Sequence, residues 1–404
     1  MTQDMDRRVS TFVAQAYERS PGVRRWFDDA GITPADIQGV ADLDKIPVLT
    51  KDKMVELQAA DPPFGGFLTV PLTDLSHIFF SPGPLYEPAV DETSLLETAV
   101  PLFRAAGFNA ESIVLNALSY HLVPAGLMVD RVLQHVGATV IPVGVGNADL
   151  QMKMLVDFGV TGYVGTPSWL ATLLKKADEQ GFPREAIRLR HALVTAEPLP
   201  PSLRAMLVDD YGIRVTNAYA TAELGFLAYD QEGQMALRLL EGPIIQVVDR
   251  DSGRSVAPGG AGEVVVTVFN PEYPLIRFGT GDMAVNVDPA PGKSTQSQRA
   301  IILVGRVGDA VKIRGMFVHP NQLAFAMRRF PAVTAYQAVV RRPELRDEWV
   351  LRLVLGGDVE DRDRLAEAVK ATVREVCRVR LDGIEFVDSL PEDTSPIVDE
   401  RTWE

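Results

Sequence analysis

Between residues 112 and 219, short β-rich apolar runs alternate with amphipathic stretches of about ten residues or more. The amphipathic stretches repeat their apolar residues with the period of a helix, whereas the short runs between them suit strands. This alternation predicts βαβ units and a parallel sheet, whose ligands gather at the carboxyl ends of the strands. The predicted strands are 112–118, 139–144, 162–165, 192–197 and 215–219, and the predicted helices are 127–136, 150–159, 168–180 and 202–212.

Different patterns flank this region. Residues 6–60 show helical periodicity interrupted by turn residues, which predicts an N-terminal helical cap. After residue 230 the chain becomes β-rich, which predicts a distorted barrel or a second sheet that closes the large domain. Its predicted strands are 243–249, 250–256, 262–270, 274–287 and 299–306, and residues 285–299, rich in turn formers, are expected to form a loop.

A smaller unit follows residue 305. The predicted fold class is therefore α/β, with a large N-terminal domain at residues 1–304 that combines βαβ parallel sheets with a β-rich subdomain. Residues 305–404 are expected to form a small α+β C-terminal lid domain. Its predicted elements are a helix at 321–330, strands at 335–342 and 348–356, a helix at 362–377 and a strand at 383–390.

Composition limits the classes of function. The 404 residues, 46% of them hydrophobic, can bury one large core and a smaller one. A net charge of −14 disfavours nucleic acid as a partner. No run reaches the roughly 18 apolar residues of a membrane span, and the start lacks the pattern of a signal peptide, so we expect a cytoplasmic protein without membrane contact. The single cysteine, Cys377, is expected to be a buried structural thiol.

Four segments carry candidate chemistry: GRVGDAVKIRGMFVHPNQL at 305–323, LIRFGTGDMA at 275–284, NAYATAELG at 217–225 and VTAEPLPPSLR at 194–204. A carboxylate such as Asp282 suits a pair of hydroxyl donors, because its two oxygens accept separately. In their order and spacing these segments resemble the signature motifs of the phenylacetate–coenzyme A ligase family, a branch of the adenylate-forming superfamily. The resemblance covers most of the chain.

The resemblance implies nucleotide, coenzyme A and metal contacts for the matching residues. Glu223 would be catalytic and hold Mg²⁺, which prefers oxygen ligands. Arg306 would be catalytic and contact the nucleotide, and Asp309 would be the hinge between the domains. The implied cofactor-binding residues are Ser81, Gly83, Ala196, Glu197, Pro198, Tyr219, Ala220, Thr221, Asp282, Arg306 and Gly315.

The resemblance also implies an aryl site. Residues 117–126 and 162–170 resemble segments that line the acyl pocket in this family, and an aromatic, glycine-lined slot favours a flat aryl acid. The implied substrate-binding residues are Tyr120, His121, Gly126, Gly165 and Tyr219. His121 could equally be a satisfied interior histidine.

Simpler structural explanations of these segments stay open. Residues 305–323 could be two strands and a turn in which Arg306 and Asp309 pair with each other. Asp282 could lie in a hairpin turn, and residues 221–224, TAEL, could be the start of a helix.

Two segments depart from the family pattern. Where the family has a phosphate-binding loop of the form SSGTTGKP, residues 79–88 read FFSPGPLYEP, so Glu87 replaces the lysine and two prolines remove N–H donors. A carboxylate 4 Å from a phosphate charge costs roughly 4 kcal/mol at an effective dielectric constant of about 20. Either Glu87 points away, or tight triphosphate binding is poor. The C-terminal stretch from 389 to 404 also lacks the family's lysine, and Lys370, in a predicted helix, is the sole lysine beyond residue 320.

Three functions follow as hypotheses. The first is an AMP-forming acyl-CoA ligase that activates an aryl, phenylacetate-like acid with ATP and Mg²⁺ and transfers it to coenzyme A. The second is an ATP-independent acyl-CoA acyltransferase or thioesterase on the same scaffold, which the altered loop and tail favour. The third is a non-catalytic protein that binds an acyl-CoA or a nucleotide. The expected partners are a small carboxylic acid and coenzyme A, and a homodimer is possible.

Overall fold

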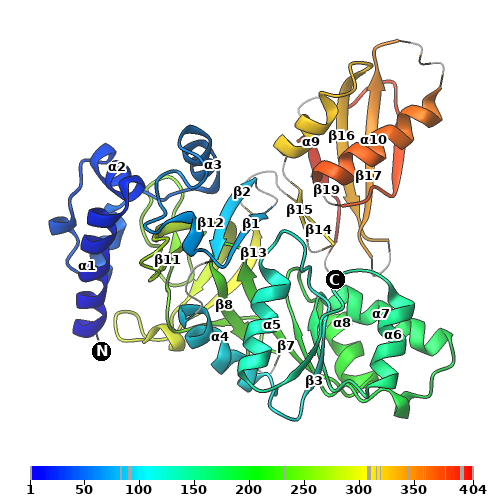
Figure 1. Ribbon diagram of the computed structural model, residues 1–404, viewed down its shortest axis with the longest axis horizontal. Coiled ribbons are helices and arrows are strands. Elements are labelled where there is room, and N and C mark those ends of the chain that lie inside the picture. Colours follow the sequence, from blue (N-terminus) through cyan, green and yellow to red (C-terminus); the bar gives the residue numbers. More distant parts are fainter. Residues whose placement is uncertain are drawn as a thin grey trace.

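The computed structural model describes residues 2–81, 84–89, 93–231, 233–306, 311–314, 316–318, 320–343, 346–357, 359, 361–377, 379–391 and 395–402. A mixed sheet of 11 strands forms the centre of the large N-terminal part, and a four-stranded sheet forms a separate unit made by the C-terminal part of the chain (Figure 1). The predicted α/β class with a smaller α+β unit is confirmed.

One half of the large sheet is parallel, as the alternating pattern predicts. Helices cover both faces of this half of the sheet. Neighbouring residues on a strand point to opposite faces, and both faces are buried here: Val164 packs into one apolar cluster and Tyr163 into another. Its strands are β3 (Ile113–Asn116), β4 (Thr139–Ile141), β5 (Gly162–Gly165), β6 (His191–Val194) and β7 (Arg214–Thr221). Its helices are α5 (Ala125–His135), α6 (Ala148–Asp157), α7 (Pro167–Glu179) and α8 (Pro201–Ala205), which continues as a π-helix over Met206–Asp210.

The other half is antiparallel and continues the same sheet. Its strands are β8 (Gly225–Asp230), β9 (Leu237–Leu239), β10 (Ile244–Val248), β11 (Ala261–Val268), β12 (Leu275–Val287) and β13 (Ala300–Arg306). The β-rich region is joined to the parallel strands through β7 and β8, in one order of 11 strands. The predicted strand at 250–256 is wrong, because these residues form a turn with one isolated bridge, Val248 to Ser255. The predicted loop at 285–299 begins only after Val287, where β12 ends.

The N-terminal helices α1 (Thr2–Arg19), α2 (Pro21–Asp29) and α3 (Lys51–Ala60) form the expected cap, which packs against the antiparallel half. Arg277 of β12 fastens this cap from inside the core. Its fully buried guanidinium donates to the carbonyl oxygens of Leu43 and Ile46 in the cap and of Gly253 in the turn before β11. The hairpin of β1 (His77–Ser81) and β2 (Leu85–Ala89) and the helix α4 (Thr93–Ala105) follow the cap.

The C-terminal unit has its own core, which contains Trp349 and Cys377. Cys377 is fully buried, as predicted. The sequence missed β19, which pairs parallel with β16. The elements are β14 (Val311–Ile313), β15 (Met316–Val318), α9 (Pro320–Met327), β16 (Val333–Arg341), β17 (Glu348–Leu355), α10 (Arg362–Cys377), β18 (Gly383–Phe386) and β19 (Ile397–Asp399).

The boundary between residues 304 and 305 remains a prediction; β13 continues to Arg306 and belongs to the large sheet. Among the described residues, the helices are too short or too polar to cross a membrane.

Arg277→Ala is expected to lower the free energy of unfolding by about 3 kcal/mol or more, because three carbonyl oxygens, two of them in buried hydrogen bonds, lose their donor and a cavity remains. Urea denaturation followed by circular dichroism measures the change. Arg254→Ala, which alters an exposed arginine in the neighbouring turn, is the control and should change the free energy by less than about 0.5 kcal/mol. Equal effects of the two substitutions would contradict the assignment of Arg277 as the residue that fastens the cap.

Candidate active site

Three residues predicted from separate segments meet at one place on the large sheet. The Tyr219 hydroxyl donates to Oδ2 of Asp282 at 2.8 Å, and Nε of Arg306 lies 3.1 Å from Oδ1 of the same carboxylate. Asp282 and Arg306 are direct partners in the pairing of β12 with β13. Burial and the neighbouring Asp282 raise the pKa of Tyr219 well above its ordinary value, so the phenol keeps its proton. Each carboxylate oxygen keeps a further lone pair, so Asp282 can still accept two hydroxyl donors, as a ribose would supply.

These positions decide between the alternatives left open by the sequence. Asp282 lies within β12, so the hairpin-turn explanation is wrong. Residues 221–224 end β7 and turn into β8, so the helix-start explanation is wrong as well. Thr221 stabilises this turn, because its hydroxyl accepts from the backbone N–H of Leu224 at 3.3 Å. Arg306 pairs with Asp282, while Asp309 lies outside the described residues.

Glu223, in the turn between β7 and β8, forms an ion pair that the sequence did not predict. Nζ of Lys51, the first residue of α3, lies 2.7 Å from its Oε1, and the Glu223 side chain is 7% exposed. Burial opposes the charge on Glu223, but Lys51, together with hydrogen bonds from the Glu223 backbone and Thr221, holds the pKa of the carboxyl below its ordinary value. A lysine in the first turn of a helix is disfavoured by the helix dipole. That unfavourable placement of Lys51 is the signal that could have revealed its role.

Glu87 lies beside this pair, on the buried face of the β1–β2 hairpin. Neither of its carboxylate oxygens has a hydrogen-bond partner among the described residues. Burial, followed by the Glu223 carboxylate, raises the pKa of Glu87 to about 8. The expectation that Glu87 either points away or repels phosphate therefore needs correction. The side chain points inward, and burial keeps it protonated at neutral pH, which removes most of the charge that the repulsion argument assumed.

Of the other residues predicted to bind the cofactor in glycine-containing loops, the structure describes Ser81. Ser81 is buried at the end of β1, in the same hairpin as Glu87. Gly83 lies outside the described residues, and so does Gly315 of the predicted thiol-arm segment. Lys370 lies in α10, as predicted, and pairs there with Glu367 at 2.9 Å.

Glu87→Gln is expected to stabilise the protein more at pH 8 than at pH 5.5. The carboxyl has a higher pKa in the folded chain than in the unfolded one, so the unfolded chain binds fewer protons between about pH 4.5 and pH 8. The wild type therefore loses up to roughly 1.4 kcal/mol per pH unit across this window, and the neutral glutamine does not. Urea denaturation at both pH values measures the difference. A stability difference between variant and wild type that does not change with pH would contradict the burial of a titrating carboxyl.

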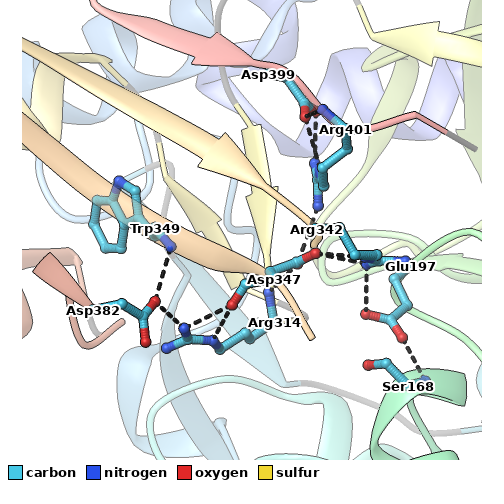
Figure 2. A network of polar contacts seen from close by, with 9 residues as sticks. All are labelled: Ser168, Glu197, Arg314, Arg342, Asp347, Trp349, Asp382, Asp399 and Arg401. Carbon is cyan, nitrogen blue, oxygen red and sulfur yellow. Dashed lines mark hydrogen bonds and ion pairs between the residues drawn. The ribbon is translucent and has the colours of Figure 1, made fainter. Parts of the chain in front are cut away.

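The predicted adenine-side residues Ala196, Glu197 and Pro198 follow the carboxyl end of β6. Ala196 adopts a left-handed backbone with φ of 74°, which is strained for a residue with a side chain. Glu197 accepts from the backbone N–H of Ser168, in the first turn of α7, at 2.7 Å. Its other oxygen faces Arg342 of the C-terminal unit (Figure 2). The carboxylate therefore connects the large sheet with the smaller unit.

The predicted aryl-site residues are spread over three elements: Tyr120, His121 and Gly126 lie at or just before the start of α5, Gly165 ends β5 and Tyr219 lies in β7. The Tyr120 hydroxyl accepts from the Asn116 side chain at 2.7 Å, Gly126 packs against Tyr120 and Gly165 packs against Tyr163. His121 is exposed, so the alternative of an interior histidine is wrong.

A cavity of about 350 Å³ lies nearby, between the β1–β2 hairpin, α4, α5 and the start of β8. Tyr120, His121, Gly126, Gly165 and Tyr219 are absent from its lining among the described residues, so their contact with substrate remains a prediction. Side chains that the sequence did not single out line it instead: Phe79, Leu95, Leu127, Met128, Phe226 and Tyr273, with Glu87 and Glu223 also in the wall.

Comparison with known proteins identifies the family to which the chain belongs. Residues 94–268 match the family model described as AMP-binding enzyme. The phenylacetate-coenzyme A ligase of Thermus thermophilus is 30% identical over 86% of this chain and 80% of the relative. The chain belongs to the phenylacetate–coenzyme A ligase family. The ligase of this name from Escherichia coli is 29% identical over 83% of this chain and 78% of the relative. As a family member the protein is an AMP-forming acyl-CoA ligase, and adenylate-forming CoA ligases use ATP and coenzyme A.

Solved structures of 2-hydroxyisobutyryl-CoA ligase share the fold. With 2-HIB-AMP and CoA in the thioesterification state, that protein matches 99% of this chain and 90% of its own, with a TM-score of 0.90 and 21% identity. In the postadenylation state with 2-HIB-AMP, the same protein matches with a TM-score of 0.71. The overall structure of this phenylacetate–coenzyme A ligase family member is thus more similar to the first of these two structures than to the second.

Proposed function

We propose that this ligase activates an aryl, phenylacetate-like carboxylic acid with ATP and Mg²⁺ and transfers the acyl group to coenzyme A. The convergence of Tyr219, Asp282 and Arg306 carries the proposal. Asp282 would accept the ribose hydroxyls of the nucleotide, while Arg306 would contact the nucleotide and stabilise charge that develops during acyl transfer. Ala220 and Thr221 would border the phosphates from the end of β7, and Ala196, Glu197 and Pro198 would border the base.

Glu223 fits the role of a magnesium ligand. One of its oxygens is buried and lacks a hydrogen-bond partner among the described residues. No cluster of three or more His, Cys, Asp or Glu side chains suited to a metal ion occurs in that part of the chain. Because Mg²⁺ keeps several waters and takes phosphate oxygens, one carboxylate is enough, and the ion would arrive with ATP. Bound there, it would neutralise phosphate charge.

Lys51 would replace part of the charge that the altered loop lacks. Its ammonium group lies at Glu223, where the family motif brings metal and phosphates together, and it comes from α3 instead of from the loop. A nucleotide that enters with its metal would offer Lys51 phosphate oxygens in exchange for Glu223. This exchange supports ATP chemistry in a chain that has Glu87 where the family has a lysine.

The apolar cavity supports an aryl acid as the substrate. Phe79, Leu127, Met128 and Phe226 give its wall the apolar and aromatic surface that suits a flat ring. The named relatives are phenylacetate-coenzyme A ligases, so phenylacetate is the first acid to test. We also propose that residues 305–404 act as a lid that moves about Asp309.

ATP–pyrophosphate exchange tests the proposal. Purified protein, Mg²⁺ and a panel of aryl and short aliphatic acids are assayed for exchange, and acyl-CoA and AMP are detected by mass when coenzyme A is added. Acid-dependent exchange is expected, strongest with aryl acids. Consumption of acyl-CoA without exchange would favour the ATP-independent acyltransferase or thioesterase, which the tail without a lysine also supports. Binding of acyl-CoA or nucleotide without turnover would indicate a non-catalytic protein.

Asp282→Asn is expected to lower kcat/KM for ATP by about tenfold to a hundredfold, because an amide offers one accepting oxygen and turns an N–H group toward either Tyr219 or Arg306. Initial rates of exchange at varied ATP concentrations measure this. Asp157→Asn, at an exposed carboxylate that pairs with Lys153 on α6, is the control and should leave the rates unchanged. Full activity of the Asp282 variant would remove this residue from the nucleotide site.

A further inference from the structure

The large sheet and the C-terminal unit meet at a buried ion pair. Oε2 of Glu197 lies 3.6 Å from Nη2 of Arg342, and the side chains are 3% and 8% exposed. Glu197 follows β6 in the large sheet, whereas Arg342 follows β16 in the smaller one. Each charge therefore comes from a different unit, and burial weakens screening by salt.

The C-terminal unit holds Arg342 in place by itself. Nε and Nη2 of Arg342 lie 2.8 Å and 2.7 Å from Oδ1 of Asp347. The other oxygen of Asp347 accepts from the backbone N–H of Arg314 and from Nη1 of Arg401, each at 3.0 Å (Figure 2). Arg401 is in turn paired with Asp399 of β19. The position of the Arg342 guanidinium is therefore set by residues of its own unit that lie beside the strand ends.

Glu197 is fixed from the opposite side and depends on Arg342 for its charge. Its first oxygen is held by the backbone N–H of Ser168, and the second lacks a hydrogen-bond partner among the described residues. Burial raises the pKa of Glu197, while Ser168 and Arg342 counteract this effect. Separation of the two units would take away the cation that faces this oxygen at 3.6 Å. The contact therefore favours the observed arrangement over one in which the units are apart.

This arrangement matches one of two states of a solved ligase. The TM-score is 0.90 against 2-hydroxyisobutyryl-CoA ligase in its thioesterification state and 0.71 against the same protein in its postadenylation state. The coverage of this chain is 99% in both comparisons, so the aligned length does not account for the difference.

We propose that the Glu197–Arg342 ion pair holds the C-terminal unit in the orientation that forms the thioester, and that Arg342 is a positioning residue for this half-reaction. The inference rests on the proposed function, because it divides that reaction into two steps with separate requirements. Adenylation uses a different orientation and does not need the pair. Loss of the pair slows transfer of the acyl group to coenzyme A and spares formation of the adenylate.

Arg342→Ala tests the proposal by separating the two half-reactions. ATP–pyrophosphate exchange is expected to stay within about twofold of wild type. The single-turnover rate of acyl-CoA formation from preformed acyl-adenylate should fall by about tenfold, which corresponds to roughly 1.4 kcal/mol. Arg342→Lys should recover part of the rate. Arg341→Ala is the matched control, because Arg341 is the neighbouring residue of the same unit and pairs with Glu400 at the surface. Equal loss of both half-reactions, or no loss of either, would overturn the proposal.

A double-mutant cycle distinguishes the ion pair from a general weakening of the C-terminal unit. Glu197→Gln removes the charge and keeps an oxygen for Ser168. If the ion pair acts as proposed, Arg342→Ala has little further effect on thioester formation in the Glu197→Gln background. An undiminished tenfold effect in that background would mean that Arg342 acts only through Asp347 inside its own unit.

Absence of exchange in the wild type would contradict the proposed function and not the role of the ion pair. A distance measurement tests that role without any activity. Spin labels at Glu179→Cys on α7 and Asp363→Cys on α10, both at exposed positions, report the separation of the units, while Cys377 is buried. A single narrow distance is expected in the otherwise wild-type chain and in the Arg341→Ala chain. A broader or bimodal distribution is expected with Arg342→Ala. An unchanged distribution would overturn the proposed role of the ion pair.

Discussion

The change from parallel to antiparallel pairing at β7 is the constraint on which the rest of the structure depends. Residues 214–217 of β7 pair parallel with β6, and residues 218–221 pair antiparallel with β8. β6 and β7 therefore run in the same direction, and the chain turns back at Glu223, after the carboxyl end of β7. Tyr219 of β7 and Asp282 of β12 lie four strands apart in the strand order, so their contact requires the sheet to curve back on itself. Arg306 lies beside Asp282 on β13. Register shifts near Tyr219 and Asp282 are typical of strands that redirect side chains next to a site.

Burial changes the electrostatics of this site from what the sequence alone indicates. In the linear sequence, Glu87 is a negative charge in place of the family's lysine. In the folded chain it lies beside a second carboxylate and away from water, so it holds a proton near neutral pH. Lys51 meanwhile compensates Glu223 from a helix far from the loop. The net charge around Glu223 thus depends on which side chains are buried together, and this cannot be read from one segment.

The sequence predicted many of the elements, but not the β1–β2 hairpin, α4, β8 or β9, and it predicted the contacts between elements only in part. Periodicity identified the βαβ units and Cys377, because buried faces repeat at fixed intervals. The motifs identified Tyr219, Asp282 and Arg306, which do converge. Local patterns could not show that residues after 230 extend the first sheet, since strand pairing is non-local. They also missed β19, a three-residue strand whose pairing with β16 exists only in the folded unit.

Two buried carboxylates at the edge of the sheet obtain their cations from opposite parts of the chain. Glu223 is paired with Lys51 of the N-terminal cap, and Glu197 with Arg342 of the C-terminal unit. Neither cation belongs to the sheet, so each ion pair is lost when the element that carries its cation moves. In the proposed function, the metal of a nucleotide would replace Lys51 beside Glu223, and the phosphate oxygens would pair with Lys51. Glu197 has no such substitute among the expected ligands, which makes its contact with Arg342 the more sensitive to the position of the lid.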